Sequence, residues 1–475
     1  MRPYLEILKL VWPLALGMIN NAVMQFADRA YLARDSMASL EAVLPAGMLA
    51  WVFMGFFQSV VGYAGVFVAQ YHGARDFGMC RSCYRAAVAL AVVSGALMLP
   101  MYALGNWILD LTAPSAEILA LERTYFGPLV LGGIFVYGQM AATAYFTGRG
   151  LTRIVFWVNL WGNLLNIALD PVLIFGWGCV PRMGIAGAAY ATVFAAAVQW
   201  VALAVAAQRH VLARSDLQST IFNLQSTISD LRDTISDLRA TISDLRVASS
   251  GYRVPWPILV RILRFGIPSG LYELLNMASF SVFVFVTGGV GDVALAASNA
   301  CFSVNYLVFA PMMGFALGAQ TLVGQARGRG DNAAASAAFL RTLALALGFV
   351  ALVGGLTLAF HRPILSLFAP ADAASSAEFH SLGATLFWLM SGWMFFDAAD
   401  VVVSGALKGA GDTRFVMVWM LVCSFVLWLP LVFVVRRFHN TMPALWSTMI
   451  VYVVVICVGS LVRWRRGKWK DIRLV

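Results

Sequence analysis

Five acidic residues lie at least five residues inside long apolar stretches of this 475-residue chain: Asp28, Asp170, Glu273, Asp397 and Asp400. An ionisable side chain at bilayer depth costs free energy, so each one is a functional candidate by default. A carboxyl group removed from water can exchange protons near neutral pH. Surrounded by amide and carbonyl oxygens, the same group can coordinate Na⁺, a hard cation that prefers oxygen ligands. The acids therefore predict a site for H⁺ or Na⁺, and their oxygen atoms serve either ion.

The fifth apolar stretch carries the longest row of polar residues, Asn159, Asn163, Asn166 and Asp170. Spacings of three and four residues place all four on one face of a helix. Lipid does not tolerate such a face, so it must lie against a partner helix or a wet cavity. For Asn159 and Asn163, interhelical hydrogen bonding is an alternative role. For Asp170 the alternative is a helix-end position near the outer surface, because Pro171 follows it.

Two further pairs of polar residues share a helix face at a spacing of three. Gln25 and Asp28 form one pair in the first apolar stretch, and Asp397 and Asp400 form the other in the tenth. We regard Asp28 as a functional residue. The candidates for a secondary cation or substrate site are Gln25, Asn163, Asp397 and Asp400.

The composition is that of a membrane protein. Hydrophobic residues make up 61% of the chain and charged residues 12%, against roughly a quarter charged in an average soluble domain. This excludes a soluble enzyme and a disordered chain. The sequence shows no nucleophile–base pair and no metal-binding cluster, so we expect a protein that is not an enzyme and has no cofactor. The net charge of +10 does not indicate nucleic acid, because membrane proteins carry surplus Lys and Arg in cytoplasmic loops.

Twelve stretches are long and apolar enough to cross a bilayer, which requires about 20 residues. The expected fold is therefore an all-α integral membrane protein with twelve transmembrane helices. The predicted spans are residues 10–33, 44–70, 85–107, 119–146, 153–177, 184–208, 265–289, 297–324, 336–360, 380–407, 415–436 and 442–462.

Basic residues are distributed unevenly over the expected loops. Of the 33 Lys and Arg residues, 26 lie at the termini and around the loops that follow the even-numbered spans, and seven lie on the other side. Cytoplasmic loops carry the excess of Lys and Arg in membrane proteins. We therefore predict a multi-pass protein of the cytoplasmic (inner) membrane with both termini in the cytoplasm.

The two halves of the chain repeat each other. The aligned segments are 68–76 with 323–331, at an offset of 255, and 148–153 with 409–414, at an offset of 261. We expect two pseudo-symmetric lobes, 1–208 and 253–475, with six spans each. An even number of spans returns the chain to the same side, so the two lobes have parallel topology. Parallel repeats of this kind are typical of secondary transporters, in which the substrate binds between the halves.

A linker, 209–252, joins the lobes on the predicted cytoplasmic side. It contains five seven-residue units over 216–250, in which Leu and Ile recur every seven residues. Ile and Leu at these heptad positions favour a parallel two-stranded coiled coil, which would make the protein a homodimer through 216–250. The alternative is a tandem expansion in a tolerant loop, because the units are nearly identical and rich in Ser and Thr, which are weak helix formers.

Several motifs, taken together, resemble the multidrug and toxic compound extrusion (MATE) family. They are Gly148-Arg149-Gly150, Asn166-Ile167-Ala168-Leu169-Asp170-Pro171, Gly184-Ile185-Ala186-Gly187-Ala188, Leu322-Val323-Gly324-Gln325 and Gly405-Ala406-Leu407-Lys408-Gly409-Ala410-Gly411-Asp412-Thr413. The resemblance covers both halves of the chain. It implies two six-helix lobes that form a V, and export of organic cations or amphiphiles driven by inward movement of H⁺ or Na⁺.

The resemblance also implies functional positions. In some members, a cation site in the first lobe uses an Asp of the first helix, an Asn and an Asp of the fifth, and a Thr of the sixth. In this chain these positions are Asp28, Asn166, Asp170 and Thr192, of which the first three would hold Na⁺. In other members an Asp of the tenth helix acts in the second lobe, which corresponds to Asp397. Those members also have a Glu where this chain has Asn276, so the second-lobe site is incomplete by this comparison.

The sequence thus favours a cation-coupled antiporter that exports small organic cations or amphiphilic drugs across a lipid bilayer. One alternative is a flippase for a lipid-linked precursor. It would need a basic central cavity, and we expect no Lys or Arg deep in a span. A second alternative is a membrane scaffold that dimerises through the heptads. The acids retained within the spans argue against it.

Overall fold

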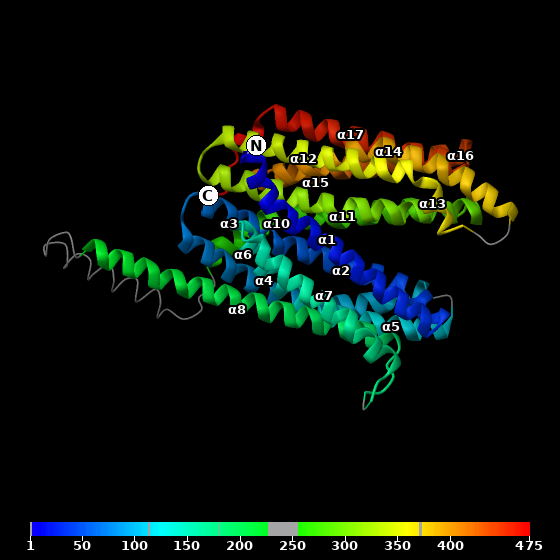
Figure 1. The fold of residues 1–475 in the computed structure, drawn as a ribbon, viewed down its shortest axis with the longest axis horizontal. Helices are drawn as coiled ribbons and strands as arrows, with labels where there is room; N and C mark the ends of the chain where they lie inside the picture. The colour runs from blue at the N-terminus through cyan, green and yellow to red at the C-terminus, as the bar shows by residue number, and fades with distance from the viewer. Residues whose placement is uncertain (1, 113–114, 179, 227–254, 370–372) are drawn as a thin grey trace.

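The computed structural model describes residues 2–112, 115–178, 180–226, 255–369 and 373–475. Every long element in these ranges is a helix (Figure 1). The first half contains α1 (Arg2–Asp35), α2 (Met37–Gly62), α3 (Ala64–Gly73), α4 (Phe77–Thr112), α5 (Ala116–Leu131), α6 (Gly133–Gly148), α7 (Thr152–Phe175) and α8 (Ile185–Ser226). The second half contains α10 (Trp256–Thr287), α11 (Asp292–Gly328), α12 (Asn332–Ala359), α13 (His361–Ser366), α14 (Ala373–Ala410), α15 (Thr413–Leu421), η1 (Val422–Trp428), α16 (Leu429–Phe438), α17 (Met442–Arg465) and η2 (Lys468–Asp471).

The predicted all-α membrane fold is confirmed. In the described part of the chain, 11 helical segments are long and apolar enough to cross a membrane, and α5 with α6 supplies a twelfth as a pair bent by 41°. Two of the 11 segments are composite. Helices α2 and α3 form one, and α15, the π-helical segment η1 and α16 form another.

Each lobe has its own apolar core, and the first helix of each half reaches into the core of the other half. Helix α1 contributes residues Ile7, Leu10, Val11 and Leu14 to the core of the second lobe. Helix α10 contributes Ile258, Leu259 and Ile262 to the core of the first lobe. The exchange is reciprocal, as expected for two repeats related by pseudo-symmetry. It makes α1 and α10 the helices that join the lobes.

We call the aligned segments the glycine-rich turns: 68–76 and 323–331, and 148–153 and 409–414. They form a reciprocal contact between the lobes. The Gln70 side chain of α3 donates from Nε2 to the carbonyl oxygen of Gly409 at 3.0 Å. The Gln325 side chain of α11 donates from Nε2 to the carbonyl oxygen of Gly148 at 2.9 Å. These four residues belong to the two aligned pairs of segments, so the duplication places the same hydrogen bond on both sides of the interface.

Two glycines allow this close approach. A Cβ atom on Gly73 would lie 2.0 Å from the carbonyl oxygen of Gln325, and one on Gly328 would lie 1.8 Å from that of Gln70. Both distances are far below van der Waals contact, so a side chain at either position is incompatible with the observed packing. The two aligned segments therefore need glycine for the contact between the lobes.

The aligned aspartates have matching local roles. Asp76 Oδ1 accepts a hydrogen bond from the Met79 backbone N–H at 2.9 Å, and Asp331 Oδ1 accepts one from the Ala334 backbone N–H at 2.8 Å. A side-chain oxygen at this position satisfies one of the free N–H groups at the start of a helix. The two residues therefore set the starts of α4 and α12, which follow the glycine-rich turns.

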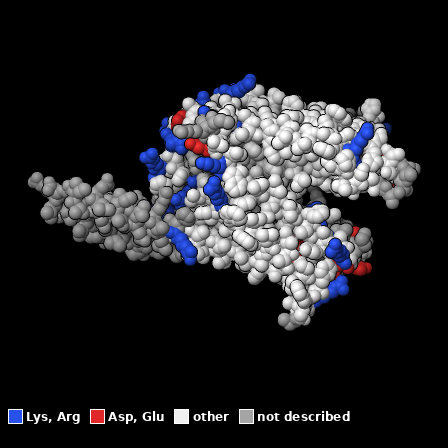
Figure 2. All heavy atoms as spheres, viewed as in Figure 1, with Lys and Arg blue, Asp and Glu red and all other residues white. Residues whose placement is uncertain are grey.

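Both chain termini lie at the same end of the molecule (Figure 1). Lys and Arg side chains gather at this end on the face shown in Figure 2. The reciprocal glutamine contacts close the molecule here, whereas the two lobes part toward the opposite end and leave a hollow between them (Figure 2). The structure therefore has a closed end that carries the termini and an open end.

Most of the heptad segment 216–250 lies outside the described residues. Helix α8 continues to Ser226, and residues 227–254 are not described. The homodimer through this segment stays a prediction.

Candidate functional site

Three helices of the first lobe bring the principal candidates together. Helix α7 packs against both α1 and α8. Asp28 on α1 is 8% exposed, and Asn166 and Asp170 on α7 are fully buried. Thr192 on α8 is partly buried beside them. The four residues predicted for the first-lobe site thus meet in one place, although α1 and α8 lie far apart in the sequence.

Asn166 connects two of these residues. With the amide oriented to satisfy both neighbours, its Nδ2 donates to Asp28 Oδ1 at 2.9 Å and its oxygen accepts from the Thr192 backbone N–H at 3.2 Å. The Thr192 hydroxyl donates to the Ala188 carbonyl oxygen at 3.0 Å, which leaves its lone pairs available. The site therefore presents carboxylate, amide and hydroxyl oxygens.

The carboxyl groups of Asp28 and Asp170 lie close enough to interact with each other. Neither oxygen of Asp170 has a hydrogen-bond donor among the described residues, and both are buried. Two adjacent carboxylates without a shared proton or a cation repel each other, and buried polar atoms without partners cost free energy. The arrangement is thus suited to hold one positive charge between α1 and α7.

The polar residues of α7 fall into two groups with different partners: Asn166 and Asp170, described above, and Asn159 and Asn163. Asn163 Oδ1 accepts from Gln199 Nε2 of α8 at 3.1 Å, and Asn159 Oδ1 accepts from Gln139 Nε2 of α6 at 3.1 Å. Gln139 also donates to the Gln199 side chain. The alternative role considered for Asn159 and Asn163, interhelical hydrogen bonding, is therefore what the structure shows for these two side chains.

Asp170 does not lie at a helix end. Helix α7 continues through Pro171 to Phe175, and the Asp170 side chain is fully buried. The alternative of a helix-end position is therefore wrong for Asp170. Gln25, one turn before Asp28, is half-buried.

Tyr125 of α5 lies close enough to both Asp28 and Asp170 for electrostatic interaction. We did not predict this residue from the sequence, because a tyrosine in an apolar stretch is most often a packing residue. The two glutamines that bind the α7 asparagines were also missed. A mid-span glutamine is itself an unusual polar residue, which was the signal available for Gln139 and Gln199.

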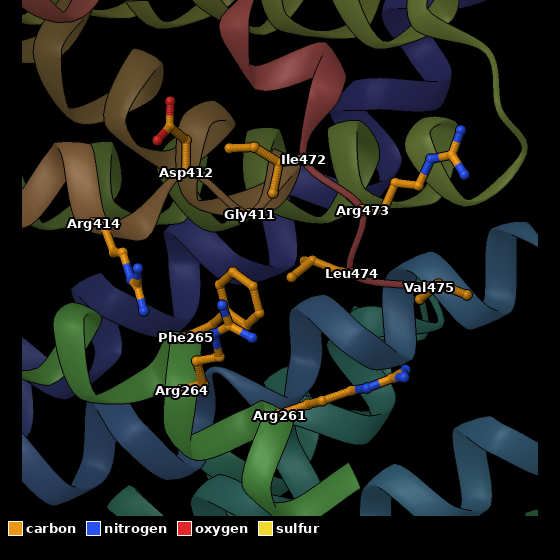
Figure 3. Close-up of a pocket in the computed structure, with 10 residues that line it drawn as sticks. All are labelled: Arg261, Arg264, Phe265, Gly411, Asp412, Arg414, Ile472, Arg473, Leu474 and Val475. Atoms are coloured by element: carbon orange, nitrogen blue, oxygen red, sulfur yellow. The ribbon is translucent and has the colours of Figure 1, made fainter. Parts of the chain in front are cut away.

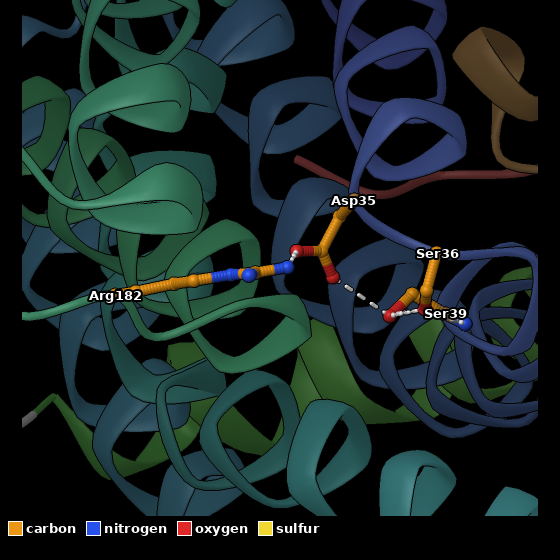
Figure 4. A network of polar contacts seen from close by, with 4 residues as sticks. All are labelled: Asp35, Ser36, Ser39 and Arg182. Carbon is orange, nitrogen blue, oxygen red and sulfur yellow. Dashed lines mark hydrogen bonds and ion pairs between the residues drawn. The ribbon is translucent and has the colours of Figure 1, made fainter.

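A polar network fixes the end of α1 two turns beyond Asp28 (Figure 4). Arg182, in the loop between α7 and α8, donates to Asp35 Oδ1 at 2.7 Å. The Ser39 hydroxyl donates to Asp35 Oδ2 at 2.9 Å, and Ser36 caps α2 by accepting from the Ser39 backbone N–H at 2.9 Å. The network joins α1, α2 and the α7–α8 loop two turns beyond Asp28.

The second lobe contains a separate polar cluster. Asp400 is 5% exposed and accepts from the Ser460 hydroxyl of α17 at 2.9 Å and from Ser404 at 3.5 Å. Asp397 is half-buried and lines a small cavity together with Asn305 of α11. The two aspartates, although three residues apart, thus have different surroundings.

Glu273 has a partner that the sequence did not indicate. The Lys408 amine lies 3.4 Å from Glu273 Oε1 and 3.8 Å from the centre of the Tyr272 ring. Lys408 was expected in a loop, but α14 extends to Ala410, which brings its amine onto α10. Glu273 is therefore neutralised by an ion pair, unlike Asp28 and Asp170. Within the described ranges, no group of three or more His, Cys, Asp or Glu side chains could hold a metal ion.

The chain is similar to named multidrug resistance proteins over nearly its whole length. A probable multidrug resistance protein NorM of Bradyrhizobium diazoefficiens is 26% identical over 445 residues, which covers 93% of this chain and 88% of that protein. The protein of the same name from Thermotoga maritima is 24% identical over 469 residues, covering 98% and 93%. Multidrug resistance protein PmpM of Pseudomonas aeruginosa is 26% identical over 432 residues, covering 90% and 82%.

Solved transporter structures share the fold. A MOP superfamily transporter from Pyrococcus furiosus superposes with a TM-score of 0.79 at 19% identity, covering 98% of this chain and 97% of that one. A point mutant of the MATE transporter VcmN of Vibrio cholerae gives a TM-score of 0.78 at 16% identity, covering 99% and 98%. The sequence model of the MatE family matches residues 13–172 and 268–434, which include both lobes. The chain therefore belongs to the MatE family of multidrug efflux transporters.

Proposed function

We propose that this protein is a cation-coupled antiporter that exports organic cations or amphiphilic drugs in exchange for H⁺ or Na⁺. The observation that carries the proposal is the buried pair of carboxyl groups, Asp28 on α1 and Asp170 on α7. The described residues provide no Lys or Arg ion pair within 4.0 Å of either group. An exchangeable cation is the natural partner for such a pair.

The coupling cation would be held by Asp28, Asn166 and Asp170, with Thr192 at the edge of the site. A proton shared between the two carboxyl groups removes one negative charge. Na⁺ would instead take its oxygens from the carboxylates and from the amide or hydroxyl beside them. In both cases one positive charge reduces the repulsion between the two carboxylates. The most stable distance between α1 and α7 is therefore different when the site is occupied and when it is empty.

Helix α1 offers a route from this site to the interface between the lobes. Its first turns pack in the core of the second lobe, whereas Asp28 belongs to the first lobe. Pro13 lies within the part that packs in the second lobe, and proline within a helix is a common position for a bend. Binding of H⁺ or Na⁺ at Asp28 can therefore shift α1, a helix that contacts both lobes. Coupling follows if cation and drug bind with different affinities to the inward-facing and outward-facing states.

We assign the closed end to the cytoplasm. Both termini lie at this end (Figure 1), and Lys and Arg residues gather there (Figure 2). Cytoplasmic loops carry the excess of basic residues in membrane proteins. The hollow between the lobes then opens to the outside of the cytoplasmic membrane. In this state an outside cation can reach the first lobe while a drug leaves the space between the lobes.

The proposal is tested in proteoliposomes that report ethidium movement. Wild type, Asp170→Asn and the control Asp292→Asn, an exposed acid at the start of α11, are compared under an imposed pH gradient and a matched Na⁺ gradient. We expect gradient-driven ethidium transport that Asp170→Asn abolishes and Asp292→Asn preserves, and the gradient that works names the coupling ion. The proposal fails if folded wild type moves no ethidium under either gradient, or if Asp170→Asn transports normally.

A further inference from the structure

A basic cavity of about 540 Å³ lies at the end of the molecule that carries the termini. This volume is within the range of roughly 300–1,000 Å³ that is usual for ligand sites. Its walls come from the start of α10, the turn between α14 and α15, and the carboxyl-terminal residues (Figure 3). The lining residues are Arg261, Arg264, Phe265, Gly411, Asp412, Arg414, Ile472, Arg473, Leu474 and Val475.

The side chains of the basic cavity carry an excess of positive charge. Four arginines line it, and Asp412 is the acidic side chain among the lining residues. That carboxylate is already bound by Arg463, at 2.7 Å from Nε and 3.2 Å from Nη2. Within the described ranges, no side-chain carboxylate forms an ion pair within 4.0 Å of the four lining arginines. Guanidinium groups bind phosphate oxygens in bidentate fashion, so the cavity suits a phosphate group.

Exposed apolar side chains lie near two of these arginines, as expected at a site for the phosphate group of a lipid. Arg414 begins an exposed apolar row on α15, formed by Val418 and Leu421 at 52% and 41% exposure. These positions, four and seven residues further on, lie on the same helix face. On α10, Ile267 lies three residues after Arg264 and is 41% exposed. Helices α10 and α15 pack against each other, so these basic groups lie close to exposed apolar side chains on two neighbouring helices, which acyl chains could cover.

We propose that the basic cavity binds the phosphate headgroup of an acidic phospholipid, whose acyl chains lie along α10 and α15. Basic pockets between transmembrane helices on the cytoplasmic side are known to favour such headgroups. The lipid would also touch both lobes. The start of α10 and Leu474 pack in the first-lobe core, whereas Arg414 belongs to the second lobe. A bound headgroup would therefore stabilise the closed end of the molecule.

The test uses the full chain, delipidated in mild detergent and titrated with phosphatidylglycerol, with retained lipid measured by native mass spectrometry. The variant Arg264→Gln/Arg414→Gln removes two basic groups of the cavity. The control Arg329→Gln/Arg466→Gln removes two exposed basic groups outside it. We expect the cavity variant to bind at least about tenfold more weakly than wild type, and the control to bind like wild type. Phosphatidylcholine, which has no net charge, should bind weakly to all three proteins.

A lysine variant tests the role of the guanidinium groups, and inorganic phosphate tests whether the cavity requires a lipid. Arg264→Lys/Arg414→Lys keeps the charge but loses bidentate binding, so its loss of affinity should be smaller than that of the glutamine variant. Equal binding of phosphatidylglycerol by wild type and both cavity variants would overturn the proposal. So would full displacement of the lipid by millimolar inorganic phosphate alone, because the site would then take a free anion. Lipid retention is measured without any transport assay. The lipid-binding proposal can therefore fail or succeed independently of the proposed antiport.

Discussion

The carboxyl groups of Asp28 and Asp170 make the first-lobe site sensitive to charge. In a medium of low dielectric, two negative charges at short range repel strongly, and a single H⁺ or Na⁺ removes most of that repulsion. The neighbouring pairs Asn163–Gln199 and Asn159–Gln139 are different, because they join neutral groups by hydrogen bonds of 3.1 Å. One part of the α7 face can therefore respond to an ion, while the other part holds α6, α7 and α8 together.

This division predicts opposite effects of two alanine substitutions on α7. Asn163→Ala leaves the Gln199 amide without its acceptor, and we expect the free energy of unfolding to fall by about 1–3 kcal/mol while gradient-driven transport persists. Asn166→Ala removes the donor to Asp28, so we expect transport to be lost with a smaller change in stability. Thermal unfolding in detergent and ethidium transport in proteoliposomes measure the two quantities. Equal loss of transport in both variants would contradict the division.

At the residue scale, helical spacing predicted part of the site. The spacings of three and four correctly placed Asn166 and Asp170 on one face, and the family resemblance supplied Thr192. Spacing along one helix cannot tell which neighbouring helix faces each residue. The partners Gln139, Gln199 and Tyr125 come from α6, α8 and α5, and were found only from the packing of the helices.

At the scale of elements, α1, α10 and the glycine-rich turns determine how the lobes meet. The first helix of each half enters the core of the other half, and the turns add the reciprocal bonds of Gln70 and Gln325. The hydrogen bonds contribute only about 1 kcal/mol each. The glycines matter more, because a side chain at Gly73 or Gly328 would overlap the opposite backbone. Shape rather than hydrogen bonding is thus the stricter requirement at the closed end.

We therefore predict that Gly328→Ala prevents closure of this end. Its Cβ would lie 1.8 Å from the Gln70 carbonyl oxygen, so the lobes must separate although each keeps its own core. Gly355→Ala on α12 is the matched control, because nothing lies within 4 Å of a Cβ there. The distance between spin labels at Ala74→Cys and Arg329→Cys should lengthen in the Gly328 variant and stay unchanged in the control. An unchanged distance with normal transport in Gly328→Ala would refute this role of the glycine.

The elements themselves were largely predictable, because each span needs a long apolar run and such runs are visible in the sequence. Their ends were less so. Helix α14 extends past the expected end at residue 407 to Ala410, and this places Lys408 on Glu273 instead of in a loop. The bend between α5 and α6 was not predicted either, although Pro128 and the pair Gly132–Gly133 lie beside it.

At the scale of the whole molecule, the contacts between the lobes follow from the internal duplication. The carboxyl pair lies within the first lobe, the reciprocal glutamine bonds join the two lobes, and the hollow opens between them (Figure 2). Internal duplication thus provides the pseudo-symmetry that many proteins obtain by dimerising. The proposed transport cycle, in which the lobes rock around a central substrate, needs no second copy of the chain.

We accordingly predict that the heptad segment is dispensable for transport. Replacing residues 216–250 by a Gly/Ser linker of equal length keeps the covalent connection between the lobes through a flexible chain. Because the contacts of the carboxyl pair and of the closed end come from residues outside this segment, ethidium transport per molecule should stay within about twofold of wild type. The comparison is made in proteoliposomes at equal protein content, with the oligomeric state measured by light scattering. Loss of transport together with conversion of a dimer to a monomer would instead show that the heptads assemble the working transporter.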